Sequence, residues 1–225
     1  MRVSISAMSQ AKNLNPIKIL PVAAILLATV SNLTAAGHPA GGQSSIAKSL
    51  DNLKAAYAGE TEASAKYLVY AKVAAKEHMP YEAGLFTAIA RSESIHARNH
   101  KRVLVAHGVR VTPTKFAGKI GTTAENVSDS LVDETHEYTV MYPDYIAQAA
   151  TEGAQDASRS FGYALQAEMG HAGFFALAEK SEKAGKTLEK AHMFVCAECG
   201  QTFETNAPAT CPVCDHALNK ASAVK

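Results

Sequence analysis

Two copies of a Glu-x-x-His pattern are the first sign of chemistry in this 225-residue chain: Glu93 with His96, and Glu168 with His171. Residues three apart lie on the same face of a helix, so each pair presents a carboxylate and an imidazole side by side. One such pair is common on a solvated helix face. Two pairs set among apolar residues are stronger evidence for a metal site.

Further glutamates interrupt apolar stripes in two other stretches of the chain. Glu60 is one, and Glu134 is another, with Glu137 following it by three residues. Glu60 and Glu93 are 33 positions apart, and Glu134 and Glu168 are 34 positions apart. This near-equality indicates two matching hairpins that contribute to one site.

The charge balance of these side chains indicates which ions they bind. Five carboxylates facing one interior repel one another and are costly to desolvate unless they are neutralised, which two divalent cations would largely achieve. Carboxylate with imidazole suits iron or manganese better than calcium, and the thiolates of a structural zinc site are absent from this set. One Glu on each of two helices, with Glu-x-x-His on each of two others, is the di-iron carboxylate arrangement. We therefore predict two irons.

The four cysteines form a second candidate site, with a CxxC pair, 11 intervening residues and another CxxC pair: Cys196, Cys199, Cys211 and Cys214. Two tight turns of this kind build a tetrahedral cage of four sulfurs. Iron and zinc both accept that geometry, and the spacing does not choose between them. In an exported protein, two disulfides are the alternative.

Apolar residues recur at helical spacing through most of the chain, with Gly and Pro only at intervals. A long connection at 109–121 separates two helical hairpins, and Pro143 is expected to kink the third helix. This order predicts an all-α, ferritin-like four-helix bundle. The expected helices are 46–77, 81–107, 122–152 and 154–184.

The chain therefore divides into a di-iron domain at 45–186 and a four-cysteine domain at 191–225. The second is too short to fold without a metal staple. Lys and Arg number 22 against 21 Asp and Glu, a net charge of +1, so nothing favours nucleic-acid binding.

The first residues have the pattern of a secretory signal peptide. Three basic residues precede an uncharged apolar run at 19–30, and small residues follow at 34–37. We predict a signal peptide at 1–36, cleavage after Ala36, and export to a bacterial periplasm. An uncleaved membrane anchor is the alternative, although the run is short for a span of about 20 residues.

With both sites in this order, the chain resembles the rubrerythrins, a family in which a ferritin-like di-iron domain precedes a rubredoxin-like domain. The resemblance runs from about residue 46 to the C-terminus. It includes the strings Ala-Gly-Glu at 58–60 and ETHEYTVMYP at 134–143. One departure is His100, which stands on the ligand face where an apolar residue is expected; we interpret it as a buried histidine behind the ligands.

The resemblance implies roles for individual residues. The iron pair would be held by Glu60, Glu93, Glu134, Glu168 and His171. In this family the second iron shifts with oxidation state between a histidine and a carboxylate, which correspond here to His96 and Glu137, and we expect these two to be catalytic. The four cysteines would hold a single iron, with zinc possible. Tyr67 and Tyr142 correspond to tyrosines that donate hydrogen bonds near the iron pair.

The resemblance also implies an activity, namely a non-haem di-iron peroxidase of oxidative-stress defence. This oxidoreductase would reduce hydrogen peroxide to water, and the rubredoxin-like iron would relay electrons from an unidentified donor protein. A head-to-tail homodimer is the expected assembly. The alternatives are a ferroxidase or iron-handling protein that uses dioxygen, and a zinc ribbon that only docks a partner.

Overall fold

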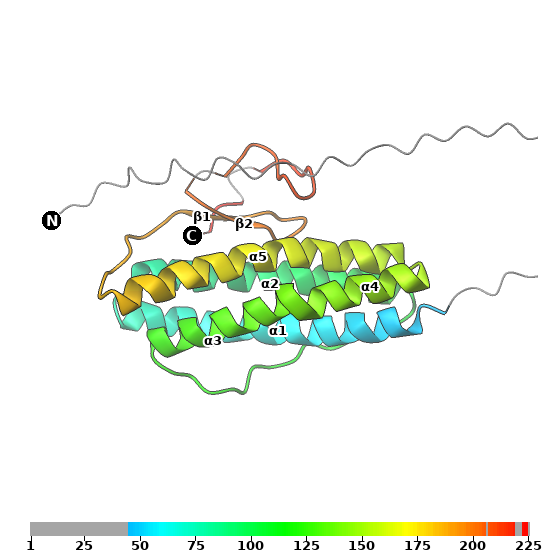
Figure 1. The fold of residues 1–225 in the computed structure, drawn as a ribbon, viewed down its shortest axis with the longest axis horizontal. Coiled ribbons are helices and arrows are strands. Elements are labelled where there is room, and N and C mark those ends of the chain that lie inside the picture. The colour runs from blue at the N-terminus through cyan, green and yellow to red at the C-terminus, as the bar shows by residue number, and fades with distance from the viewer. Residues whose placement is uncertain (1–44, 206, 219–221, 225) are drawn as a thin grey trace, which may run out of the picture. The chain divides into compact units, whose positions relative to one another are not determined.

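The computed structural model describes residues 45–205, 207–218 and 222–224, which belong to one compact unit. Four long helical segments lie along one another (Figure 1). α1 and α2 form the first hairpin, and a segment of three consecutive elements forms the second with α5. The predicted all-α bundle is confirmed. Its elements are α1 (Ala47–Lys76), α2 (Pro80–Ala106), α3 (Thr123–His136), η1 (Glu137–Met141), α4 (Tyr142–Glu152) and α5 (Gln155–Lys183).

The predicted signal peptide at 1–36 lies outside the described residues. Among the helices that are described, none combines the length and the apolar character needed to cross a membrane.

The helix ends follow from local sequence. The Thr122 hydroxyl accepts a hydrogen bond from the Glu125 N–H, and the Glu125 carboxylate accepts one from the Thr122 N–H, which completes a capping box at the start of α3. Gly153 ends α4 with φ of 71°, a left-handed conformation that glycine adopts without a steric penalty. α2 begins at Pro80, one residue earlier than predicted, because proline suits the first helical position.

The third helical segment differs from the prediction in its interior. A π-helical turn, η1, lies between α3 and α4, and the N–H of Tyr142 bonds to the carbonyl of Glu137, five residues back. Pro143 falls in the first turn of α4, where its missing N–H costs little. The irregularity of this segment is therefore a π turn that begins at Glu137. Such turns are frequent at functional sites.

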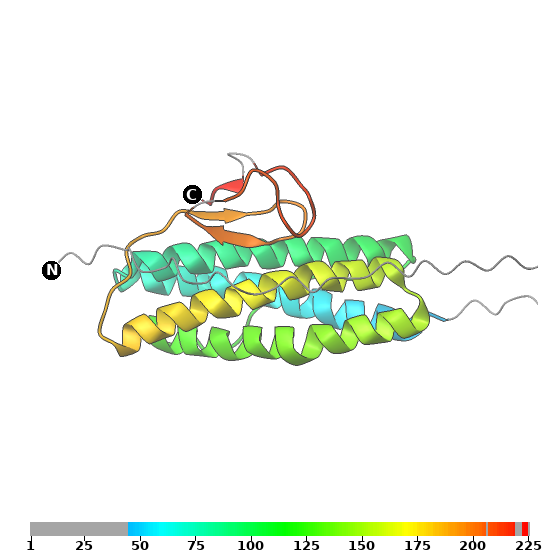
Figure 2. The same ribbon diagram turned by 45° about the horizontal axis from the view of Figure 1, so that its top comes forward.

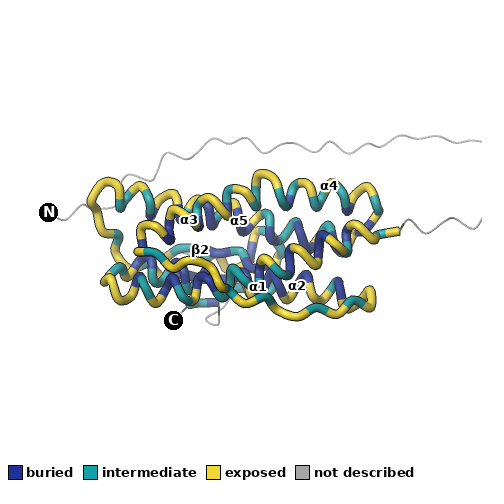
Figure 3. Tube along the Cα trace, turned by 90° about the horizontal axis from the view of Figure 1, so that it is seen from below, coloured by how far each residue is buried: buried dark blue, intermediate teal, exposed yellow. Residues whose placement is uncertain are grey.

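The bundle core consists of two apolar clusters. The first contains Phe86, Ile89 and Phe175, and the second contains Leu53, Leu104 and Phe161; all six side chains have no exposed surface. The dark blue stretches in Figure 3 show this burial along the inward faces of the helices. Burying a side chain of this size contributes about 2 kcal/mol. These clusters hold the helices that carry the predicted ligands.

The C-terminal tail folds back over the bundle (Figure 2). Its two short strands, β1 (Met193–Val195) and β2 (Thr202–Glu204), form an antiparallel pair in which Phe194 faces Phe203. Both strands contact α2, and β2 also contacts α5. Met193 joins the first apolar cluster of the bundle. The tail and the bundle are therefore packed against each other within one chain.

Candidate metal centres

Six of the predicted ligands meet in one buried layer of the bundle. They fall into two overlapping groups, in each of which the ligand atoms lie within 4.8 Å of one another. Glu93 and Glu168 belong to both groups, so they are placed to bridge two ions. The first group is Glu60, Glu93, His96 and Glu168, and the second is Glu93, Glu134, Glu168 and His171.

Both histidines turn the same ring nitrogen toward the carboxylates. His96 Nδ1 lies 2.9 Å from Glu93 Oε2 and 3.0 Å from Glu168 Oε1. His171 Nδ1 lies 2.6 Å from Glu168 Oε2 and 3.3 Å from Glu134 Oε2. The three-residue spacing of each Glu-x-x-His pair thus brings both of its side chains to the layer, as the sequence predicts.

Two tyrosines bind the outer carboxylates of the layer. Tyr67 donates a hydrogen bond to Glu134 Oε1, and Tyr142 donates one to Glu60 Oε1. Burial, followed by the negative charge of these same glutamates, raises the pKa of both phenols well above 10. Each tyrosine therefore remains a hydrogen-bond donor.

The donor set fits a pair of divalent cations. Both carboxylate oxygens of Glu93, Oε2 of Glu134, Oε1 of Glu168 and Nδ1 of His96 are buried without a hydrogen-bond partner, even where ion-pair distances are short. An unsatisfied buried polar atom costs about 1–3 kcal/mol, and more when it is charged. Carboxylate oxygens from four glutamates with imidazole nitrogens from two histidines suit iron or manganese.

The electrostatics of the layer indicate how strongly it requires positive charge. Burial raises the pKa of Glu60 to about 8 and that of Glu134 to about 7. Burial is the largest influence on Glu93 and raises its pKa, but the charge of His171 together with hydrogen bonds from His171 and His96 lowers that pKa below 4.5. Burial disfavours the charged form of His96, yet Glu60 and Glu168 raise its pKa well above 6.5. Without metal, protons would supply the charge that cations supply when they are bound.

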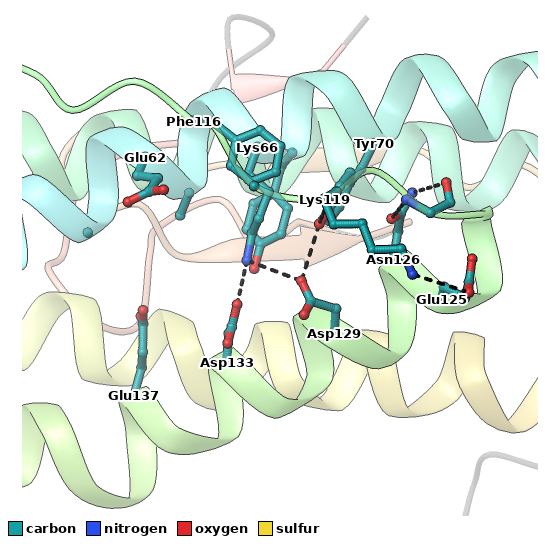
Figure 4. Close-up of a pocket in the computed structure, with 15 residues that line it drawn as sticks. Glu62, Lys66, Tyr70, Phe116, Lys119, Glu125, Asn126, Asp129, Asp133 and Glu137 are labelled. Atoms are coloured by element: carbon teal, nitrogen blue, oxygen red, sulfur yellow. Dashed lines mark hydrogen bonds and ion pairs between the residues drawn. The ribbon is translucent and has the colours of Figure 1, made fainter.

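Glu137, the seventh predicted ligand of the iron pair, is not part of either group. It is half-buried and lines a recess of about 490 Å³ at the edge of the layer, together with Tyr67 and Glu62 (Figure 4). Burial and then the charge of Glu60 raise its pKa well above 4.5. The structure therefore places His96 within the clustered side chains of the layer and Glu137 beside them.

A buried lysine spans the same recess. The ammonium of Lys66 donates a hydrogen bond to Asp133 and lies 3.8 Å from Asp129 Oδ2 (Figure 4). Lys66 is only 8% exposed. This ion pair joins α1 to α3 across the opening that leads toward Glu137.

The four cysteines converge as predicted. The Sγ atoms of Cys196 and Cys214 are 3.5 Å apart, as are those of Cys199 and Cys211, and all four lie within 4.8 Å of one another. A tetrahedral site with metal–sulfur bonds of about 2.3 Å has sulfurs about 3.8 Å apart, whereas a disulfide needs about 2.05 Å. A hydrogen bond from the Cys199 thiol lowers the pKa of Cys196 well below its usual value of 9, which favours the thiolate form. The geometry fits a single metal ion rather than two disulfides.

The tail contacts the outer nitrogens of both histidines. His171 Nε2 lies 3.1 Å from Thr202 Oγ1, and a Cβ placed on Gly200 would lie 2.4 Å from His96 Nε2. Ser92 also donates a hydrogen bond of 2.6 Å to the Gly200 carbonyl. Outer contacts of this kind fix the ring orientation of a metal-binding histidine. The residues that follow the first CxxC turn thus support the bundle site.

These supporting residues are the ones that the sequence analysis missed. Gly200 and Thr202 follow Cys199 closely, but no local pattern shows which helix they touch. Lys66 could have been identified from the sequence as a buried polar residue, because it interrupts the apolar face of α1 next to Tyr67.

Comparison with known proteins supports the whole arrangement. A family model described as rubrerythrin matches residues 51–179. Rubrerythrin-2 of Clostridium acetobutylicum is 36% identical over 171 residues, which cover 75% of this chain and 92% of that protein. Nigerythrin of Nitratidesulfovibrio vulgaris is 33% identical, with 83% of this chain and 91% of that protein covered. A solved structure of fully reduced, all-ferrous nigerythrin superposes with a TM-score of 0.71 and 30% identity over 82% of this chain and 90% of that one.

Metal-free protein should lose stability as the pH rises from 5 to 8. Glu60 and Glu134 keep protons in the folded state up to about pH 8 and about pH 7, whereas their ordinary pKa is 4.5. The unfolded chain therefore binds fewer protons across this window, and stability falls as the pH rises. The raised pKa values of His96 and His171 act in the same direction. We expect the free energy of unfolding to fall by at least about 2 kcal/mol.

Urea unfolding of chelator-treated protein at several pH values measures this change. Iron-loaded protein is the control, and its profile should be flatter because cations replace the protons. A metal-free profile that is level or rising between pH 5 and 8 would contradict the prediction.

Gly200→Ala should loosen the tail. Gly200 has φ of +86°, and an added Cβ would meet His96 Nε2, so the substitution adds both backbone strain and a clash. We expect a loss of about 2 kcal/mol or more in local stability, measured as faster amide hydrogen exchange in β1 and β2. Gly173→Ala in α5 is the control, because a Cβ there meets nothing within 4 Å. Equal exchange in both variants would show that the close approach to His96 is unimportant.

Proposed function

Because this chain belongs to the rubrerythrin family of di-iron oxidoreductases, which serve oxidative-stress defence, we propose that it is a peroxidase that reduces hydrogen peroxide to water. The observation that carries the proposal is that the residues just after Cys199 lie against both histidines of the carboxylate layer. Gly200 lies against His96, and Thr202 lies against His171. A protein that only stored iron would have no use for this connection.

The reaction takes one peroxide, two electrons and two protons to two waters. When bound, two ferrous ions supply the two electrons and the Lewis acidity that O–O cleavage requires. The chain's own residues position these ions, admit the peroxide and provide the protons. The recess lined by Tyr67, Glu62 and Glu137 is the opening through which a molecule as small as peroxide reaches the layer.

We propose that Glu137 and His96 alternate as ligands. His96 contacts Glu93 and Glu168, whereas Glu137 lines the neighbouring recess. Glu137 opens the π turn, where hydrogen bonds span five residues and the helix is less tightly wound. Replacing a neutral imidazole by a carboxylate adds one negative charge, which suits a site that has become more positive on oxidation.

Electrons return to the layer through the tail. Cys199 precedes Gly200, and the Gly200 backbone packs against the imidazole of His96, so one residue links the cysteine cluster to a ligand of the layer. The donor that reduces the cysteine centre remains unidentified, and we propose that it is a separate electron-transfer protein. A head-to-tail homodimer stays a prediction.

Peroxide should restore the colour of the reduced protein. The iron–thiolate centre is reduced without air, hydrogen peroxide is added, and visible absorbance is followed. We expect a faster return of colour with peroxide than with dioxygen. Return only with dioxygen would favour the ferroxidase, and a protein colourless in every state would place zinc in the cysteine site.

Glu137→Ala should slow this return at least about tenfold, because His96 then has no carboxylate to exchange with. The absorbance of the oxidised cysteine centre should stay unchanged. Glu62→Gln is the matched control, since Glu62 lines the same recess without being a ligand candidate (Figure 4). Equal rates for Glu137→Ala and the unmodified protein would contradict the exchange.

We also propose that the chain is exported to the periplasm after cleavage of residues 1–36. Expression in a bacterium with two membranes should give a mature protein that starts at Gly37 in the periplasmic fraction, as measured by intact mass. Full-length protein in the membrane fraction would support the uncleaved anchor instead, and full-length protein in the cytoplasm would contradict export.

A further inference from the structure

His100 and Ser160 are buried polar residues that the proposed mechanism does not use. His100 has no exposed surface and stacks against Phe161 of the second apolar cluster, with ring centroids 5.5 Å apart. Its two ring nitrogens are nevertheless both paired. Nδ1 lies 2.8 Å from Ser160 Oγ, and Nε2 lies 3.2 Å from the Tyr142 hydroxyl. These contacts link His100 to the metal layer, because Tyr142 binds Glu60.

With the His100 proton on Nε2, all three hydrogen bonds in this chain of residues run in one direction. Tyr142 donates its proton to Glu60, so the Tyr142 oxygen is free to accept from Nε2–H of His100. His100 Nδ1 then carries no proton and accepts from the Ser160 hydroxyl. Burial lowers the pKa of His100 to about 3, which agrees with a neutral ring that has a single N–H. Ser160, His100 and Tyr142 therefore form an unbroken donor series that ends on Glu60.

The outer end of the series reaches the surface. Ser160 is 6% exposed and lines a recess of about 210 Å³ with Asn99, Asp156 and Arg159. A water molecule occupies about 30 Å³ of the liquid, so this recess has room for several. The walls include the polar side chains of Asn99, Asp156 and Arg159, which can hold ordered water. Neither His100 nor Tyr142 lines the larger recess beside Tyr67 and Glu137.

The other half of the bundle offers an internal comparison. Tyr67 binds Glu134 as Tyr142 binds Glu60, but the residue four positions after His171 is Phe175, whereas the residue four positions after His96 is His100. The Phe175 ring centroid lies 5.7 Å from that of Tyr67, and the His100 ring centroid lies 6.0 Å from that of Tyr142. Beside Tyr67, the phenylalanine ring of Phe175 therefore occupies the position that His100 occupies beside Tyr142. A buried histidine costs more to desolvate than phenylalanine, so packing alone does not explain it.

We propose that Ser160, His100 and Tyr142 are a proton relay from the small surface recess to Glu60. The inference rests on the proposed peroxide reduction, which consumes two protons in a layer whose carboxylates are at most 3% exposed. The series supplies those protons without opening the bundle. His100 and Ser160 act through Tyr142 and are positioning residues for the proton, not ligands.

Each transfer in the relay breaks one O–H or N–H bond and forms another. A water in the recess gives a proton to Ser160 as the Ser160 hydroxyl proton passes to His100 Nδ1, and the hydroxide left in the recess takes a proton from bulk solvent. The Nε2 proton passes to the Tyr142 oxygen, and the original Tyr142 proton passes to Glu60 Oε1. No electron moves, and the net result is one proton carried from the recess to Glu60. The ring and the two hydroxyls then turn back before the next proton.

Hydroxyl proton exchange tests the relay without any turnover. The protein is loaded with zinc, which is redox-inactive and diamagnetic, and its tyrosines are labelled with carbon-13 at the ring carbon that bears oxygen. NMR then gives the rate at which each tyrosine hydroxyl exchanges with deuterated solvent. In His100→Gln, the amide can hold both hydrogen bonds but cannot pass a proton. We expect Tyr142 exchange to slow at least about tenfold, with Tyr67 exchange unchanged as the control within the same molecule.

Two further variants sharpen the result. His100→Phe reproduces the Phe175 side of the bundle and should slow Tyr142 exchange as much as His100→Gln does. Ser160→Ala should also slow it, because the outer donor is lost. Unchanged Tyr142 exchange in His100→Gln would overturn the relay. If both tyrosines exchange faster in the His100 variants, the core has loosened, and the rate in Ser160→Ala then decides: slower Tyr142 exchange supports the relay, and an unchanged rate overturns it.

The same variants separate the relay from the peroxidase proposal. In the iron-loaded protein, His100→Gln should slow the return of colour after peroxide and raise its solvent deuterium isotope effect. If the unmodified protein does not react with peroxide while Tyr142 exchange still depends on His100, the relay stands and the peroxidase proposal fails. If peroxide reacts equally fast in both proteins and Tyr142 exchange is unchanged, the relay alone fails.

Discussion

Buried negative charge is the constraint on which this structure depends. Four glutamates that are at most 3% exposed meet between two apolar clusters. The free energy gained by apolar packing does not offset the desolvation free energy of four carboxylates. The surrounding structure works against that cost. Two phenols donate to the outer carboxylates, two imidazoles approach the inner ones, and five buried ligand atoms are left for cations. The bundle is therefore stable as a metal-binding protein, and its long helices serve to hold ligands from four segments at one level.

The two halves of the bundle are alike in their ligands and differ in what surrounds them. Beside Tyr67, a wide recess and the π turn at Glu137 leave the layer open to a small molecule. Beside Tyr142, the structure is closed, and His100 replaces the phenylalanine of the other half. Under the proposals made here, peroxide and protons reach the layer from different sides.

Much of the bundle was accessible from the sequence because helical periodicity is a local property. The three-residue spacing of Glu93 with His96, and the capping box at Thr122, each follow from one turn of helix. The paired CxxC turns are equally local. The π turn was missed because a shift of one residue in the apolar pattern is hard to tell from ordinary irregularity, and the sequence analysis expected a kink at Pro143 instead. The contact of Gly200 with His96 spans more than a hundred residues, so no local pattern contains it.

The docking of the tail makes the two metal centres interdependent. The tail is too short to fold on its own core, so its order depends on the ion held by its cysteines. Thr202 and Gly200 in turn stand against the outer nitrogens of His171 and His96, whose inner nitrogens face the carboxylates. An ion in the cysteine cage would therefore do more than carry the electrons of the proposed reaction, because it would keep in place the residues that orient both imidazoles. By the same linkage, ions in the layer fix the surface on which the tail folds, and each centre stabilises the other through a contact one residue from Cys199.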